Sequence, residues 1–140
     1  MLWKSPLDID ALNQMPPNIA QHIGIRFSGW DDESLSATMP VDGRTHQPAG
    51  ILHGGASVVL AESLGSVASN LLIDASKYAA VGLEVNANHL RPVADGIVTG
   101  TCRAVHIGGK THVWDIRITN EQGKLVCISR LTVAIIARPA

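Results

Sequence analysis

One carboxylate, Glu62, interrupts the most apolar stretch of this 140-residue sequence, residues 55–73. If that stretch is a helix, Glu62 lies opposite a leucine stripe, on a face of small residues that includes Gly55, Gly65, Ser66 and Ser69. A solvated face would carry several charged side chains, whereas small residues are typical of a face that a ligand or a second helix approaches closely. Apolar surroundings disfavour the charged carboxylate and suit it to act as a general base or a nucleophile. We therefore predict a partly buried, functional Glu62 rather than an exposed one.

The pair Gly54-Gly55 opens the same predicted helix. First-turn amides have no acceptor within the helix, and the helix dipole makes that end positive. Because glycine lacks a Cβ, a substrate carbonyl could come within hydrogen-bonding distance of a free Gly55 amide, which could then hold an oxyanion. The alternative is that the two glycines only form a simple turn between the loop and the helix. Gly55 and Glu62 are seven residues apart, or about 10.5 Å along the helix axis. We therefore expect them to act together across antiparallel helices of a two-fold dimer.

Three further polar residues lie near these groups. Gln47 and His53 could hydrogen-bond a substrate carbonyl, a water molecule or Glu62, although a lone histidine is usually structural. Ser66, one turn after Glu62, could orient water, but serines within helices commonly bond the carbonyl four residues earlier.

Other catalytic motifs are not matched by the sequence. Gly109-Lys110-Thr111 ends like a P-loop, but position 104 is alanine where that motif requires glycine. The six histidines show neither the HExxH pattern nor paired cysteine spacing, so we predict no metal site. No Gly-x-Ser-x-Gly elbow is present.

The composition sets limits on class and partners. The chain is 46% hydrophobic and 16% charged, with 11 Lys and Arg against 12 Asp and Glu, so we expect one folded domain over residues 1–140 and no nucleic-acid partner. So few charges also favour a homo-oligomer. Without a leader or an uninterrupted apolar span, we expect a cytoplasmic protein with no membrane association. Cys102 and Cys127 are predicted to be buried thiols.

The helices and strands that position these groups can be predicted from hydrophobic periodicity and from residues that end helices. We expect short helices over residues 8–15 and 18–24, the second ended by Gly24, and then a strand or hairpin over 25–39. A loop over 40–54 precedes a helix over 55–72, whose apolar stripe comprises Leu60, Leu64, Val67 and Leu71. Alternating patterns then predict a four-strand meander, with strands near 81–87, 97–106, 114–118 and 125–135.

This order predicts an α+β fold in which an antiparallel sheet wraps around a long central helix, as in the hot-dog fold. Residues 47–63, 37–42, 81–91 and Val113-Trp114 closely resemble the hot-dog acyl-coenzyme A thioesterases. Within that family the chain is most similar to the bacterial 1,4-dihydroxy-2-naphthoyl-coenzyme A hydrolases and related aroyl thioesterases.

The resemblance implies a role for each candidate residue. Glu62 would be the nucleophile or general base, the Gly55 amide would polarise the thioester carbonyl, and Gln47, His53 and Ser66 would form a polar shell. It also implies a coenzyme A channel, with Arg91 and Lys110 facing phosphates. The residues of that channel would be Gly82, His89, Leu90, Arg91, Pro92, His106, Ile107, Gly108, Gly109, Lys110 and Thr111. Close relatives often have Ser-Arg where this chain has Gly109-Lys110. This chain therefore keeps the positive charge at that place but lacks the serine hydroxyl.

The predicted function is hydrolysis of an aromatic or medium-chain acyl-coenzyme A by a dimer of dimers, without metal or organic cofactor. Two alternatives remain open on the sequence. A non-catalytic module could bind acyl-coenzyme A or an acyl carrier, although it would have no reason to keep Glu62. A hot-dog enoyl-coenzyme A dehydratase would need a histidine base, and His53 is compatible with that role.

Overall fold

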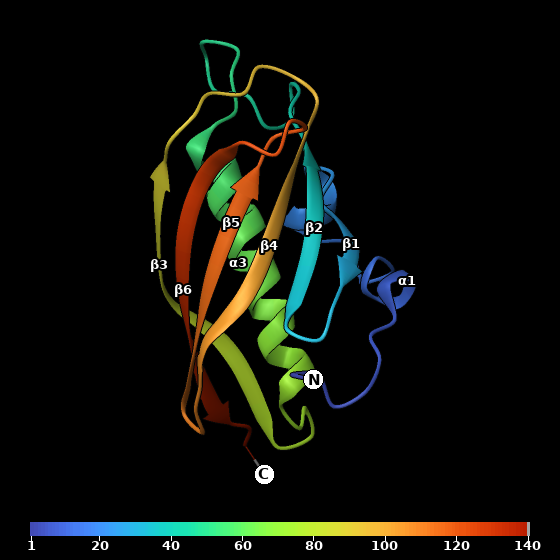
Figure 1. The fold of residues 1–140 in the computed structure, drawn as a ribbon. Coiled ribbons are helices and arrows are strands. Elements are labelled where there is room, and N and C mark those ends of the chain that lie inside the picture. The colour runs from blue at the N-terminus through green and yellow to red at the C-terminus, as the bar shows by residue number, and fades with distance from the viewer. Residues whose placement is uncertain (140) are drawn as a thin grey trace.

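The computed structural model describes residues 1–139 and shows a six-stranded antiparallel sheet curved around one long helix (Figure 1). The elements in chain order are α1 (Ile9–Leu12), α2 (Ile19–His22), β1 (Arg26–Trp30), β2 (Ser34–Pro40), α3 (Gly54–Leu72), β3 (Tyr78–His89), β4 (Ile97–Ile107), β5 (Thr111–Thr119) and β6 (Leu125–Ala137). The α+β architecture with a central helix is as predicted, and the first strand region is a hairpin.

The two N-terminal helices are shorter than predicted, and asparagine side chains mark the end of the first and the start of the second. The side chain of Asn18 caps α2 by accepting from the Gln21 amide at 3.2 Å, and Gly24, at φ +85°, ends it as expected. After α1, the side chain of Asn13 turns to β1. It donates to the Phe27 carbonyl at 2.9 Å and accepts from the Phe27 amide at 2.8 Å, which fixes the segment against the sheet.

The strand order is β1-β2-β4-β5-β6-β3, so the predicted four-strand meander is wrong. Only β4, β5 and β6 form a meander, while β3 pairs with β6 at the far edge. The connection from β3 to β4 therefore passes over the end of the sheet instead of making a tight turn. Hydrogen bonds hold it there, from the Leu52 amide to the Val93 carbonyl at 2.8 Å and between His46 Nε2 and the Ala94 carbonyl at 2.9 Å.

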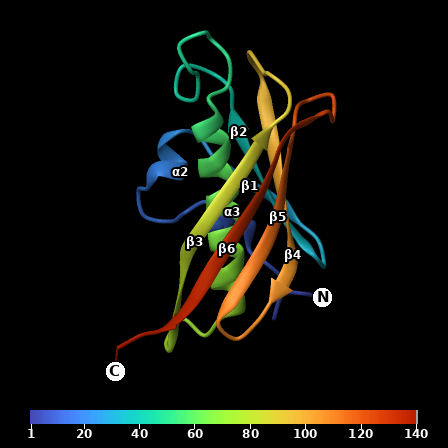
Figure 2. The same cartoon turned by 90° about the vertical axis from the view of Figure 1, so that its left-hand side faces the viewer.

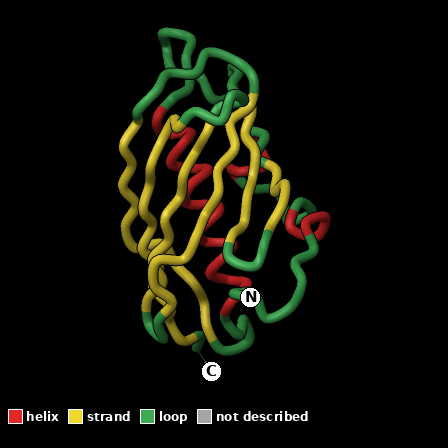
Figure 3. The backbone as a smooth tube through the Cα atoms, viewed as in Figure 1, coloured by secondary structure: helices red, strands yellow, loops and turns green. Residues whose placement is uncertain are grey.

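Helix α3 crosses the concave side of the sheet, with loops gathered at both ends (Figure 3). Leu60 and Leu64 of the predicted stripe are fully buried. The buried arc extends further than predicted, however, and includes Ala61, Gly65, Ala68 and Ser69. Gly65 and Ser69 therefore pack on the sheet of the same chain and are not free to meet a second helix. Small residues allow the helix backbone to approach the strands closely, which is why the leucine stripe alone misplaced the centre of the buried face.

Helix α3 has the length and mean hydropathy of a membrane span, as core helices of globular proteins also can. Here its buried side packs on the sheet. The predicted buried thiols are confirmed, since Cys102 and Cys127 are both buried and free. Burial raises the pKa of the Cys102 thiol to about 12.

The tight contact between α3 and β4 can be tested at Gly100. A Cβ on Gly100 would lie 2.8 Å from Leu64 Cδ1 and 3.2 Å from Leu60 Cδ2, both buried. We expect Gly100→Ala to lower the free energy of unfolding by about 1–3 kcal/mol through overpacking. Gly29→Ala is the matched control, because no described atom beyond its chain neighbours lies within 4 Å of a Cβ there. Denaturant titration followed by circular dichroism measures both, and equal stability of Gly100→Ala and the parent would contradict the close contact.

Candidate functional site

Glu62 is half-buried and lies where α3 meets the edge strand β3. A Cβ built on Gly82 would collide with Glu62 Oε2, so the carboxylate rests against the Gly82 backbone. The pairing of β3 with β6 is irregular between Gly82 and Glu84. The prediction that Glu62 is partly buried is confirmed. Gly82, which the sequence linked only to coenzyme A, is the residue that makes room for this carboxylate.

The N-terminus of α3 differs from the prediction of a free amide at Gly55. The Gly55 N–H donates to His53 Nδ1 at 2.7 Å, so the His53 side chain caps the helix. Because Nδ1 accepts this hydrogen bond, the ring is neutral and carries its proton on Nε2. Both residues are exposed, and a rotation of the His53 side chain would release the amide.

Several predicted residues meet in a cavity of about 350 Å³ at this end of α3. A Cβ on Gly54 would lie 2.7 Å from His89 Nε2, so the helix also comes close to β3 here. Gln47 belongs to the same cavity, and its side chain accepts from the Ala49 amide within the loop. The predicted residues that line this cavity are Gln47, His89, Leu90, Arg91 and Pro92.

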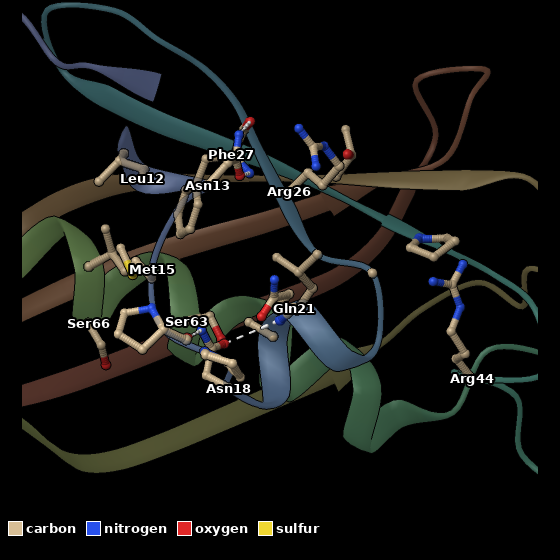
Figure 4. A pocket seen from close by; sticks show the side chains of 18 of the residues that line it. Leu12, Asn13, Met15, Asn18, Gln21, Arg26, Phe27, Arg44, Ser63 and Ser66 are labelled. Atoms are coloured by element: carbon tan, nitrogen blue, oxygen red, sulfur yellow. Dashed lines mark hydrogen bonds between the residues drawn. The ribbon is translucent and has the colours of Figure 1, made fainter. Parts of the chain in front are cut away.

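A larger cavity, of about 790 Å³, lies on the other side of α3, under the segment that contains α1 and α2 (Figure 4). Ser63, Ser66 and Val67 line it from the helix, and Met15 and Phe27 line it from the N-terminal segment and β1. Ser66 therefore lines a cavity, where its hydroxyl could meet a ligand. This cavity could not be predicted from the sequence, because its walls are far apart in the chain. Pro16 and Pro17, between the two N-terminal helices, are also in the lining.

The remaining predicted residues, 106–111, comprise the β4–β5 turn and the strand ends beside it, at the opposite end of the sheet (Figure 2). Helix α3 and strand β6 both end at this end of the sheet (Figure 2). The Ile135 amide of β6 donates to the Lys110 carbonyl of the turn at 2.8 Å. The 19 residues of α3 span about 28 Å. Within one chain, residues 106–111 therefore lie far from Gln47, Gly55 and residues 89–92, and the structure does not bring the predicted coenzyme A residues together.

The site offers carboxylate, imidazole and amide groups. Across residues 1–139, no group of three or more His, Cys, Asp or Glu side chains is placed to hold a metal ion. A half-buried carboxylate can move a proton or attack a carbonyl carbon, while the amides of a helix N-terminus can hold a developing negative charge.

Comparison with known proteins identifies the family. Residues 49–127 match the model of the thioesterase superfamily. The chain is 60% identical over 136 residues to a Pseudomonas aeruginosa protein named as an esterase, PA1618, covering 96% of this chain and 94% of that protein. It is 51% identical over 137 residues to the 1,4-dihydroxy-2-naphthoyl-CoA hydrolase of Escherichia coli strain K12, covering 97% of this chain and 100% of the hydrolase.

The solved structures agree with the sequence comparisons. A crystal structure of a variant of the thioesterase PA1618 matches with a TM-score of 0.96 at 57% identity, covering 99% of this chain and 100% of that chain. These relatives favour hydrolysis over the binding-module and dehydratase alternatives. The chain belongs to the thioesterase superfamily and is a thioester hydrolase with the hot-dog fold.

Proposed function

We propose that this thioesterase hydrolyses aromatic or medium-chain acyl-coenzyme A, with Glu62 as the general base or nucleophile and the Gly55 amide polarising the thioester carbonyl. The observation that carries the proposal is the position of Glu62. Its carboxylate is half-buried against Gly82, one helical turn from Ser66, which lines the larger cavity. A carboxylate in that place can act on a thioester whose acyl group occupies the cavity.

The acyl group fits the larger cavity by size and by lining. Its volume of about 790 Å³ lies within the range of small-molecule sites, ~300–1,000 Å³. Leu12, Met15, Phe27 and Val67 supply apolar surface, and Ser63 and Ser66 supply hydroxyls. One relative is named for a two-ring aromatic thioester, 1,4-dihydroxy-2-naphthoyl-CoA, which makes aroyl thioesters the first class to test.

Two routes use the same groups. In the first, Glu62 takes a proton from water, the water oxygen bonds to the carbonyl carbon, and the Gly55 N–H stabilises the resulting oxyanion. The C–S bond then breaks, and the proton returns to the leaving thiolate. In the second, Glu62 attacks the carbonyl carbon and expels the thiolate, and water hydrolyses the anhydride. Both routes require His53 to release the Gly55 amide.

The candidate residues lie at two opposite ends of the sheet, and this separation supports a dimer. The edge strand β3 is 12 residues long and exposes Val81 and Leu83, the latter at 66%. A long apolar edge of this kind is a template for another strand. Pairing of β3 with β3 of a second copy about a two-fold axis would place the two α3 helices antiparallel, so that Glu62 of one copy approaches Gly55 of the other. The same operation would bring residues 106–111 towards residues 89–92. We propose a homodimer as the active unit, within a dimer of dimers.

The role of Glu62 is tested by Glu62→Gln, which keeps the size of the side chain and removes its basicity. We expect kcat to fall about 10²-fold or more, as for other positioned acid–base groups. Release of free thiol from aroyl and aliphatic acyl-coenzyme A substrates measures the rate, and Glu33→Gln, an exposed residue between β1 and β2, is the control. Parent-like turnover by Glu62→Gln would refute both routes.

Gly82→Ala tests whether the position of the Glu62 carboxylate matters. The added methyl must displace Oε2, and a misplacement of about 1 Å can cost up to ~10²-fold, so we expect kcat to fall about tenfold or more. Because the displaced atom ends a flexible side chain, the unfolding midpoint should stay close to that of the parent. Gly29→Ala again serves as the control. A reduced midpoint with an unchanged kcat would show that Gly82 has only a structural role.

The shared site is tested by mixing two inactive variants. One variant carries Glu62→Ala and the other carries Gly55→Leu, which blocks the approach of the carbonyl. If each site draws Glu62 from one copy and Gly55 from the other, a heterodimer has one intact site and one doubly defective site. Thiol release should recover towards about half the parental sites in the heterodimer fraction. Verified heterodimers without activity would place both groups in one subunit.

A further inference from the structure

The N-terminal segment that covers the larger cavity is joined to the sheet through one side chain, that of Asn13. Its Nδ2 donates to the Phe27 carbonyl at 2.9 Å, and its Oδ1 accepts from the Phe27 amide at 2.8 Å. Figure 4 shows the two residues beside each other. Strand β1 lies at one end of the strand order, so its outer edge has no neighbouring strand. The Asn13 side chain occupies that edge and pairs with Phe27 as the peptide group of a further strand would.

No other hydrogen bond of the described chain joins residues 8–17 to the sheet. Helix α1 also rests on the core through Ile9 and Leu12, and this apolar contact does not depend on Asn13. Residues 13–17, here called the wall segment, follow α1 and contribute no side chain to the core cluster. The position of the wall segment is therefore set at Asn13, while the fold itself has other supports.

The wall segment is stiff between two fixed ends. Pro16 and Pro17 have restricted φ angles. At the far end, Asn18 Nδ2 donates to the Pro16 carbonyl at 2.8 Å, and the Asn18 side chain also caps α2, which contacts α3. Met15 and both prolines line the cavity from the wall segment, and Ser66 lines it from α3. The separation of these two walls is thus fixed by Asn13 at one end and by α2 at the other.

We propose that Asn13 is a positioning residue for acyl specificity, which holds the cavity at a fixed width that favours a planar aromatic acyl group over a flexible alkyl chain. The inference rests on the proposed function, in which the acyl group occupies this cavity. A rigid ring gains dispersion contacts on both faces only if the walls keep their separation, whereas an alkyl chain can change its conformation to fill a wider space. Phe27, the one aromatic residue among the described residues that line the cavity, is held by the same two bonds.

The selectivity between two thioesters tests this role. We expect Asn13→Ala to lower the ratio of kcat/KM for 2-naphthoyl-coenzyme A to that for decanoyl-coenzyme A about three- to tenfold, mostly through a higher KM for the aroyl substrate. The kinetic constants for the decanoyl substrate should change by less than about twofold. Asn13→Asp keeps an acceptor for the Phe27 N–H but loses the donor, so its ratio should lie between those of Asn13→Ala and the parent.

Asp8→Ala is the matched control within the same N-terminal segment. Asp8 caps α1 by accepting from the Ala11 amide at 3.1 Å, and it does not line the cavity. Its loss should lower the unfolding midpoint, as the loss of Asn13 does, but leave the selectivity ratio unchanged. An equal ratio in Asn13→Ala and the parent, or an equal fall of the ratio in Asn13→Ala and Asp8→Ala, would overturn the inference.

A binding measurement separates this inference from the proposed function. Ketone analogues of the two thioesters, with a methylene group between the carbonyl and the sulfur, cannot release a thiol, and calorimetric titration gives their affinities. A weaker preference for the naphthyl analogue in Asn13→Ala supports the inference even if the parent hydrolyses neither thioester, a result that would refute only the proposed function. An unchanged preference would overturn the inference. So would a parent that binds both analogues no more tightly than coenzyme A itself, because the acyl groups would then not occupy the cavity.

Discussion

The close contact between α3 and the sheet is the constraint on which the site depends. At Gly65 and Gly100 the helix and the strands leave no room for a Cβ, and at Gly82 the missing side chain is replaced by the Glu62 carboxylate. A helix held at a greater distance would leave Glu62 in solvent. The position of the Glu62 carboxylate and the core packing are therefore consequences of the same short distance.

The residues with unusual chemistry could be found from sequence because their signals are local. Glu62 stands out against its small neighbours, Gly24 ends a helix through its own backbone, and residues 40–54 lack sustained periodicity. The strand order could not be found in this way. The segment from Arg91 to Gly96 looks like a turn, yet it spans the end of the sheet, because its hydrogen bonds are to the loop before α3 and not to its own neighbours.

Other errors have the same origin. The sequence predicts a free Gly55 amide, since a helical pattern does not show that the side chain of the residue before the helix folds back as a cap. The larger cavity combines residues from the first 27 positions with residues of α3, and no single stretch of sequence carries that information. The resemblance placed residues 89–92 and 106–111 in one channel, although one chain holds them at opposite ends of a helix about 28 Å long. In the proposed dimer, a second copy would bring the two segments together.

The His53 cap has a further consequence for how the enzyme would use its binding energy. When the site is empty, the Gly55 N–H already has an imidazole acceptor, so a neutral thioester carbonyl that replaces the ring exchanges one hydrogen bond for another of similar strength. An oxyanion is a much stronger acceptor than either. Under the proposed mechanism, the amide would therefore contribute little to holding the substrate and much to lowering the barrier, which is the condition for a contact to raise kcat and not only tighten binding. In that mechanism, an internal competitor of this kind would make the helix terminus selective for the transition state.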